Sequence, residues 1–250
     1  YEESVRFFED MFRNNGSVID LLDADHAFLN ERLAGHYGID GVSGDEWRKV
    51  EGVKASGRGG VLGLATVLAT NSGASRTSPI LRGNWIYETL LGERLPRPPA
   101  NVPDLPERVP EGLTARELIE RHSSEPGCAK CHELIDPYGF ALERYDTIGR
   151  LRPNSINTST SLTNGTVFEG IDGLRHYLVG ERLDDVLKQF CRKLLGYALG
   201  REVQLSDLLL LEEMQRRLKV SGYRFNEAVE TIVTSPQFRK IRGRLAENEG

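Results

Sequence analysis

Apolar residues recur at helical spacing along most of the chain, and few stretches alternate as strands do. The first periodic stretch covers residues 2–13 and is expected to end at Asn14-Asn15-Gly16. The apolar residues expected on its buried side are Val5, Phe8, Met11 and Phe12. Ser17 is expected to cap a short helix that follows. This periodicity predicts a mostly α-helical protein.

Local start and stop signals place the other helices. Asp25 is expected to cap a helix that closes at Gly38. Ser78-Pro79, a capping residue followed by a proline in the first turn, predicts a helix that runs to Leu91. The remaining predicted helices cover residues 61–69, 114–122 (which opens with a capping box), 182–199, 206–219 and 225–234.

Two segments interrupt the helical pattern. Residues 95–112 contain many prolines and are expected to form an extended strap. Residues 152–169 are polar and are expected to form a loop with a small β-hairpin. The predicted organisation is an N-terminal helical module, the strap, a cofactor segment and a C-terminal helical module in one compact unit, with bounds at 1–94, 95–112, 113–170 and 171–250.

Composition narrows the class of protein. The chain has 250 residues, of which 39% are hydrophobic and 28% charged, and this balance is typical of a soluble globular fold. A net charge of -5 argues against nucleic-acid binding, which favours a basic face. No apolar run approaches the roughly 18 residues of a membrane-spanning helix. Because the sequence opens at Tyr1 inside a helical pattern, we expect it to be a fragment or a processed form.

The stretch Cys128-Ala-Lys-Cys131-His132 holds two of the three cysteines. A thioredoxin-like dithiol would follow a strand, whereas the segment before Cys128 is predicted to be a helix and a loop. A structural zinc site needs four ligands, but the sequence has no second Cys-x-x-Cys pair, and Cys191 lies on another predicted helix. These two alternatives stay open beside a third, which accounts for all five positions.

The third interpretation is covalent attachment of haem c. In c-type cytochromes both cysteine sulfurs form thioethers with the haem, and the histidine that follows coordinates the iron. The residues after His132 include Pro137, expected to form a turn, and the apolar side chains of Phe140, Leu142 and Tyr145, expected to cover the ring. The motif therefore predicts one covalent haem held by Cys128, Cys131 and His132.

The segment HSSEPGCAKCHELIDPYGFALERYDTIGRLR resembles the haem segment of the large planctomycetal cytochrome c-like proteins, which are built of domains of unknown function. Other parts of the chain are similar to further modules of that family: residues 28–39, 58–62, 76–85, 193–201, 223–225 and 232–238. The resemblance covers nearly the whole chain. It implies a helical cytochrome c-like haem domain with additional packed helices, rather than a particular reaction.

The second axial position of the iron decides between an electron carrier and a catalyst. His122, six residues before Cys128, is the first candidate for the distal ligand, and His36 is the second. Thiolate ligation by Cys191, ligation by a tyrosine and an open site are the alternatives, although Cys191 is expected to be a small buried hydrophobe. The haem propionates need cationic or N–H donors, for which four residues in family-like stretches are candidates: Arg58, Arg76, Arg82 and Trp85.

The function predicted from these observations is electron transfer by a monohaem c-type cytochrome domain. It would be a module of a larger exported protein, periplasmic or at the cell surface, with a redox partner protein. One alternative is a haem peroxidase or oxidase with an open distal site. Another is a structural or sensor module in which the haem mainly holds the fold together.

Overall fold

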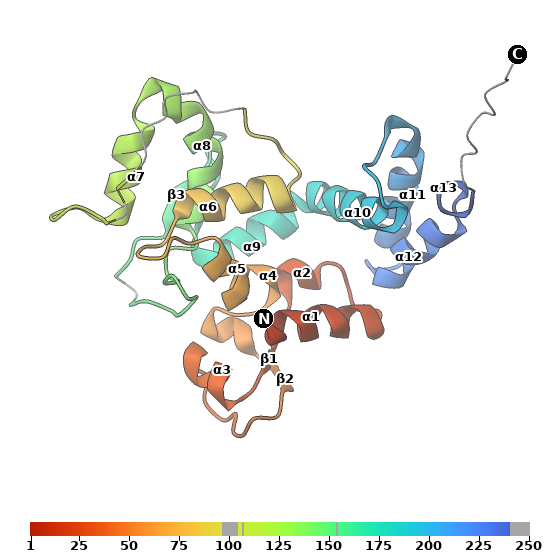
Figure 1. Cartoon of the computed structure of the whole chain (residues 1–250), viewed down its shortest axis with the longest axis horizontal. Coiled ribbons are helices and arrows are strands. Elements are labelled where there is room, and N and C mark those ends of the chain that lie inside the picture. The colour runs from red at the N-terminus through yellow and green to blue at the C-terminus, as the bar shows by residue number, and fades with distance from the viewer. Residues whose placement is uncertain (97–104, 107, 154, 241–250) are drawn as a thin grey trace, which may run out of the picture.

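A computed structural model (Figure 1) describes residues 1–96, 105–106, 108–153 and 155–240. The structure is 57% helical, with two small antiparallel two-stranded sheets, and this confirms the predicted mostly α class with a small β-hairpin. Residues 97–104 of the predicted strap lie outside the described residues. Within the described ranges, no helix is long and apolar enough to cross a membrane.

The elements follow one another along the chain in a largely helical order. The α-helices are α1 (Glu2–Arg13), α2 (Asp20–Asp23), α3 (Glu31–Tyr37), α4 (Gly60–Gly63), α5 (Ala65–Thr70), α6 (Pro79–Asn84), α7 (Ala115–Ser123), α8 (Pro126–Phe140), α9 (Gly170–Gly180), α10 (Leu183–Leu199), α11 (Leu208–Val220), α12 (Phe225–Thr234) and α13 (Pro236–Arg239). The strands are β1 (His26–Leu29), β2 (Arg48–Glu51), β3 (Ser159–Ser161) and β4 (Val167–Glu169). Short 3-10 helices η1 (Val53–Ser56) and η3 (Leu205–Asp207) and the π-helix η2 (Trp85–Leu90) complete the set.

The helix predicted to begin at Asp25 is wrong in its first half. Residues 26–29 form strand β1, which pairs with β2 in the register His26↔Glu51 to Leu29↔Arg48. The Asp25 carboxylate accepts a hydrogen bond from the Lys54 amide (2.8 Å) rather than capping a helix. Asn30 caps α3 instead, through a bond from the Leu33 amide (3.0 Å), and Gly38 closes this helix in the left-handed region (φ 72°) as predicted.

Helix α1 has the predicted bounds but a different buried side. Phe7 and Met11 are buried, whereas Val5 and Phe12 are 39% and 43% exposed. The ring of Phe12 lies at the edge of the fold, stacked on Phe225 with 4.4 Å between ring centroids. Apolar spacing alone therefore predicted the helix, and its neighbours set which side is buried.

Most other helices confirm the predictions made from local start and stop signals. The predicted cap at Ser78 and the predicted capping box at Thr114 are both present, and the helix from Pro79 continues into the π-helix η2. The helix predicted over 61–69 is broken at Leu64, whose backbone is extended. No bounds were predicted for helix α9, whose glycines are poor helix formers. A Cβ at Gly173 would lie 3.1 Å from that of Phe168, so a larger residue there would need Phe168 to shift slightly.

Four hydrophobic clusters of buried residues hold the described elements together, and two of them are large. The central core surrounds α8 and consists of Leu22, Leu62, Leu68, Ile86, Leu91, Tyr138, Ala141, Leu142, Tyr145, Phe168, Ile171, Leu174, Tyr177, Leu178 and Val186. The C-terminal core consists of Met11, Val18, Leu187, Cys191, Leu195, Leu210, Leu211, Met214, Leu218, Phe225, Ala228 and Ile232. Helix α10 contributes to both, through Val186 on one side and Leu187, Cys191 and Leu195 on the other.

The first and the last described segments of the chain lie side by side. The Val18 amide donates to the Tyr223 carbonyl (2.8 Å), and the Phe225 amide donates to that of Gly16 (3.0 Å). The Asn226 amide donates to the Asn15 side chain (2.9 Å), although these residues are 211 positions apart. These bonds tie the loop after α1 to the start of α12.

Candidate haem-attachment site

Helix α8 carries the Cys-x-x-Cys-His motif in its first turns. Pro126 occupies the start of the helix, where its missing amide donor costs nothing. Cys128, Cys131 and His132 stand three and four positions apart, so they share one face of the helix. Both thiols are free and half-buried, and His132 is 8% exposed. The helix therefore presents two sulfurs and one imidazole together.

The turn predicted at Pro137 is wrong, because this residue lies inside α8. A proline in a helix removes one backbone hydrogen bond. The helix continues since the Pro137 carbonyl still accepts from the Ala141 amide (3.3 Å). Close packing on α6 also fixes this part of α8: a Cβ at Gly139 would lie 1.9 Å from the Pro79 carbonyl oxygen, and one at Gly83 would lie 2.0 Å from that of Ile135.

A buried carboxylate holds the imidazole of His132. His132 Nδ1 lies 2.9 Å from Asp136 Oδ2 and 3.0 Å from Oδ1, one helical turn further along α8. Burial raises the pKa of Asp136, and the hydrogen bond with His132 opposes that rise. Because an ionised carboxylate only accepts, Nδ1 is the donor, and the lone pair of the neutral ring then lies on Nε2. Asp136 was not predicted as a site residue, although its spacing of four from His132 on a helix is a readable signal.

The two predicted distal histidines lie in different places. His122, in the last turn of α7, is beside His132, with ring centroids 5.0 Å apart at 75°. Burial lowers the pKa of His122, and the neighbouring His132 lowers it further. His36 lies on α3, at the bottom of the view in Figure 1, whereas α7 lies at the upper left. Its Nε2 donates to the Ile148 carbonyl (2.9 Å), and its Nδ1 accepts from Arg150 Nε (3.2 Å).

A cavity of about 520 Å³ opens beside His132, within the size range of cofactor sites. It lies between α7, α8 and the β3–β4 hairpin, and its walls include Asp136, Glu133 and Phe140. Arg116 of α7 reaches across it. The Arg116 guanidinium lies 4.4 Å from the Phe140 ring centroid and donates to the Ser159 carbonyl (2.9 Å). Arg116 was not predicted, because its place depends on how α7 packs against a distant hairpin.

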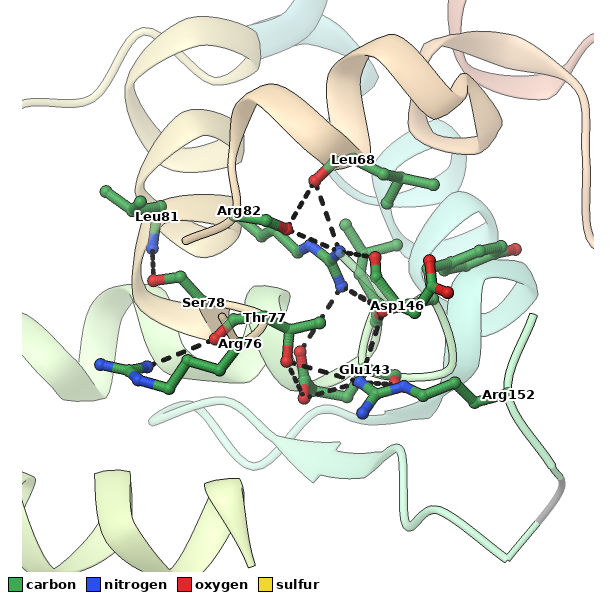
Figure 2. Close-up of polar contacts among 12 residues, drawn as sticks. Leu68, Arg76, Thr77, Ser78, Leu81, Arg82, Glu143, Asp146 and Arg152 are labelled. Carbon is green, nitrogen blue, oxygen red and sulfur yellow. Dashed lines mark hydrogen bonds and ion pairs between the residues drawn. The ribbon is translucent and has the colours of Figure 1, made fainter. Parts of the chain in front are cut away.

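The structure gives Arg82 a buried network of its own, drawn in Figure 2. Its guanidinium donates to the carbonyls of Leu142 (2.9 Å), Tyr145 (2.8 Å) and Asp146 (2.7 Å), where the chain leaves α8. Glu143 lies 3.5 Å from Arg82 and also accepts from Thr77 (2.9 Å) and Arg152 (3.1 Å). Arg82 thus ties α6 to the segment after the motif helix.

The other predicted propionate ligands also make contacts within the fold. Arg58 is buried, donates to the carbonyls of Gly149 (2.7 Å) and Gly63 (3.2 Å), and lies over the Tyr37 ring at 3.6 Å. Arg76 donates to the carbonyls of Pro106 (3.1 Å) and Thr77 (3.3 Å). Trp85 packs partly buried against the central core. Contact of Arg58, Arg76, Arg82 or Trp85 with haem propionates stays a prediction.

Cys191 lies apart from the other two cysteines. It is 0% exposed in the C-terminal core, and burial raises the pKa of its thiol to about 12. It therefore packs as a small buried hydrophobe, as expected. Over the described ranges, no group of three or more histidine, cysteine or acidic side chains is placed to hold a metal ion by itself.

The donor set is consistent with haem c. Two free thiols and an imidazole with an available Nε2 lie close together on the first turns of α8. His132 also lines the cavity, which has an apolar wall and a cationic side chain, whereas neither cysteine lines it. Thioether attachment needs reduced thiols, and axial ligation needs a neutral imidazole. The free thiols meet the first requirement, and the hydrogen bond at Nδ1 of His132 leaves Nε2 as the nitrogen for axial ligation.

Three family models match successive segments of the chain, each described as a protein of unknown function. They are DUF1592 over residues 1–39, DUF1588 over residues 58–155, which includes the Cys-x-x-Cys-His motif, and DUF1585 over residues 164–238. No curated protein and no solved structure matches the chain. Its three segments match the PSD and PSCyt families of planctomycete cytochrome c-like proteins.

Proposed function

We propose that this chain is a monohaem c-type cytochrome unit that transfers electrons. The observation that carries the proposal is the common placement of Cys128, Cys131 and His132 on the first turns of α8, with His132 fixed through its Nδ1. The match of this segment to a cytochrome c-like family supports the proposal. Bound haem would supply a one-electron redox couple.

Each residue has a defined task under this proposal. Cys128 and Cys131 would hold the haem through thioether bonds, and His132 Nε2 would ligate its iron. His122 is the proposed distal ligand, because it is the histidine that lies beside His132. The apolar side chain of Phe140 forms one wall of the cavity and would shield part of a bound ring from water, which would influence the potential.

The proposed location is the periplasm or the cell surface. Thioether attachment in bacteria takes place after export, on reduced cysteines. We therefore propose that the unit belongs to a larger exported redox protein and exchanges electrons with a partner protein.

The first prediction is that protein matured in the periplasm contains one covalent haem. Its mass should exceed that of the polypeptide by one haem, and the haem should survive acid-acetone extraction. Cys128→Ala with Cys131→Ala should abolish this attachment, whereas Cys191→Ala should retain full haem content because Cys191 lies in the C-terminal core. An unmodified mass, or haem that is fully extractable, would contradict the proposal.

The second prediction concerns the distal side. Two histidine ligands give a low-spin iron, so His122→Ala should convert the optical spectrum to high spin and allow carbon monoxide to bind. His36→Ala is the matched control and should leave the spectrum unchanged, since both of its ring nitrogens have partners away from α8. A wild-type protein that is already high spin and reacts with peroxide would favour a peroxidase over an electron carrier.

A further inference from the structure

We propose that Asp136 is a positioning residue for the proximal histidine and holds the haem potential low. This inference rests on the proposed function and adds to it a second residue of α8, outside the Cys-x-x-Cys-His motif. Its basis is the pair of short contacts between His132 Nδ1 and both carboxylate oxygens of Asp136, at 2.9 and 3.0 Å.

The hydrogen bond from His132 Nδ1 to Asp136 is directional, and no other described residue shares the Asp136 carboxylate. Among the described residues, His132 is the only hydrogen-bond partner that the structure gives the Asp136 carboxylate. Both side chains are nearly buried, with Asp136 5% exposed and His132 8% exposed. Because Nδ1 is engaged, the ring cannot rotate without losing a buried hydrogen bond. Nε2 is thereby left as the nitrogen available to iron.

Stability of α8 does not explain this pair. Both side chains are buried, and the desolvation penalty of a buried ion pair can equal or exceed its Coulombic gain. Such a pair is therefore weak evidence of a stabilising role. Asp136 and His132 also line the same cavity rather than the interior of the central core. The pair is thus better suited to orienting a ligand than to holding the helix.

The negative charge of Asp136 affects how strongly His132 would bind iron. A histidine that donates its second N–H to a carboxylate becomes a more basic metal ligand than one that donates to a neutral group. A stronger donor stabilises ferric iron relative to ferrous iron, so the reduction potential falls. Asp136 is therefore expected to lower the potential without touching the haem.

The test compares two variants that remove one negative charge from the same cavity. Asp136→Asn keeps the shape but weakens the bond to His132 Nδ1. Glu133→Gln is the matched control, because Glu133 lines the cavity without bonding to His132. Both proteins should carry one covalent haem by mass. In a spectroelectrochemical titration, Asp136→Asn should shift the potential upward, and Glu133→Gln should shift it much less.

The possible outcomes distinguish a failure of the proposed function from a failure of the role given to Asp136. A wild-type protein without covalent haem would remove the proposed function itself. Haem-loaded wild type and variants with equal upward shifts would show that only the cavity charge matters, and this result would overturn the role of Asp136. An unchanged potential in Asp136→Asn would overturn it as well.

A second measurement covers the case in which Asp136→Asn does not fold. In the reduced wild-type protein, brought to low spin with carbon monoxide if its distal side is open, His132 can be followed by proton NMR. A buried Nδ1 proton bound to a carboxylate should give a far-downfield resonance that exchanges slowly with water. A proton that exchanges too fast to be observed would contradict the positioning role.

Discussion

At the scale of single residues, buried charges shape the fold as much as apolar side chains do. Glu3 of α1 is 3% exposed and accepts a hydrogen bond from the Tyr37 hydroxyl (2.5 Å), which itself accepts from the Ala65 amide (3.0 Å). Arg58 lies over the ring of the same tyrosine. Burial raises the pKa of Glu3 to about 7, although Tyr37 and Arg58 counteract part of the rise.

The raised pKa of Glu3 makes the free energy of unfolding depend on pH over a defined range. Between about pH 4.5 and 7 the folded protein keeps the Glu3 proton and the unfolded chain loses it, so stability falls as pH rises. The full effect is on the order of 3 kcal/mol. Glu3→Gln should therefore raise the free energy of unfolding at pH 8 and leave it unchanged at pH 4, as measured by urea denaturation.

Glu2, the residue before Glu3, provides the control for this experiment. Glu2 is 43% exposed and pairs with Arg6 on the surface of α1, so Glu2→Gln should change stability little at either pH. Equal effects of Glu3→Gln at pH 4 and pH 8 would mean that Glu3 is not the group that titrates.

The sequence predicted the motif residues of the site and missed residues that depend on packing. Cys128, Cys131 and His132 are recognisable because their chemistry lies in adjacent turns of one helix. Arg116 could not be found in this way, since its partners lie on the β3–β4 hairpin. Arg58 and Arg82 were expected at propionates because of their glycine-rich or turn-like surroundings. In the structure their guanidinium groups satisfy backbone carbonyls that such turns leave without partners.

At the scale of elements, the accuracy of prediction follows the range of the interactions. The helices that start at Pro79, Ala115 and Phe225 were predicted because their signals lie within a few residues. Strands β1 and β2 were missed because neither is long or strongly alternating, and their pairing is set by the chain between them. The β-propensity of single residues cannot by itself predict which strands pair.

The close approach of helices α6 and α8 at Gly139 gives a direct test of the fold. A methyl group at Gly139 would lie 1.9 Å from the Pro79 carbonyl oxygen, so Gly139→Ala must push α6 away from α8. We expect a loss of about 3 kcal/mol or more in the free energy of unfolding, at the upper end of overpacking costs. Chemical denaturation of the wild type and the variant would measure this loss.

Gly127→Ala on the same helix is the matched control. No atom lies within 4 Å of a Cβ at this position, and alanine favours the helix. We expect a change below about 1 kcal/mol, in the stabilising direction. A similar loss in both variants would show that the tight approach of α6 and α8 is absent in solution.

At the scale of the whole molecule, the cofactor segment and the C-terminal helices form parts of one connected structure. Helix α10 places Val186 in the central core and Cys191 in the C-terminal core, so neither cluster can open without disturbing this helix. The C-terminal core also takes Met11 and Val18 from the start of the chain. Each of these two clusters thus draws residues from more than one of the predicted modules.

The bonds between residues 15–18 and 223–226 also bear on the order of events during biogenesis. Closing a loop of this length costs more chain entropy than forming local helices, so this contact is expected to form late. Until residue 226 has been synthesised, helix α1 lacks this partner. A chain truncated before residue 223 would lose these bonds and would leave the loop after α1 without its partners from the far end of the sequence.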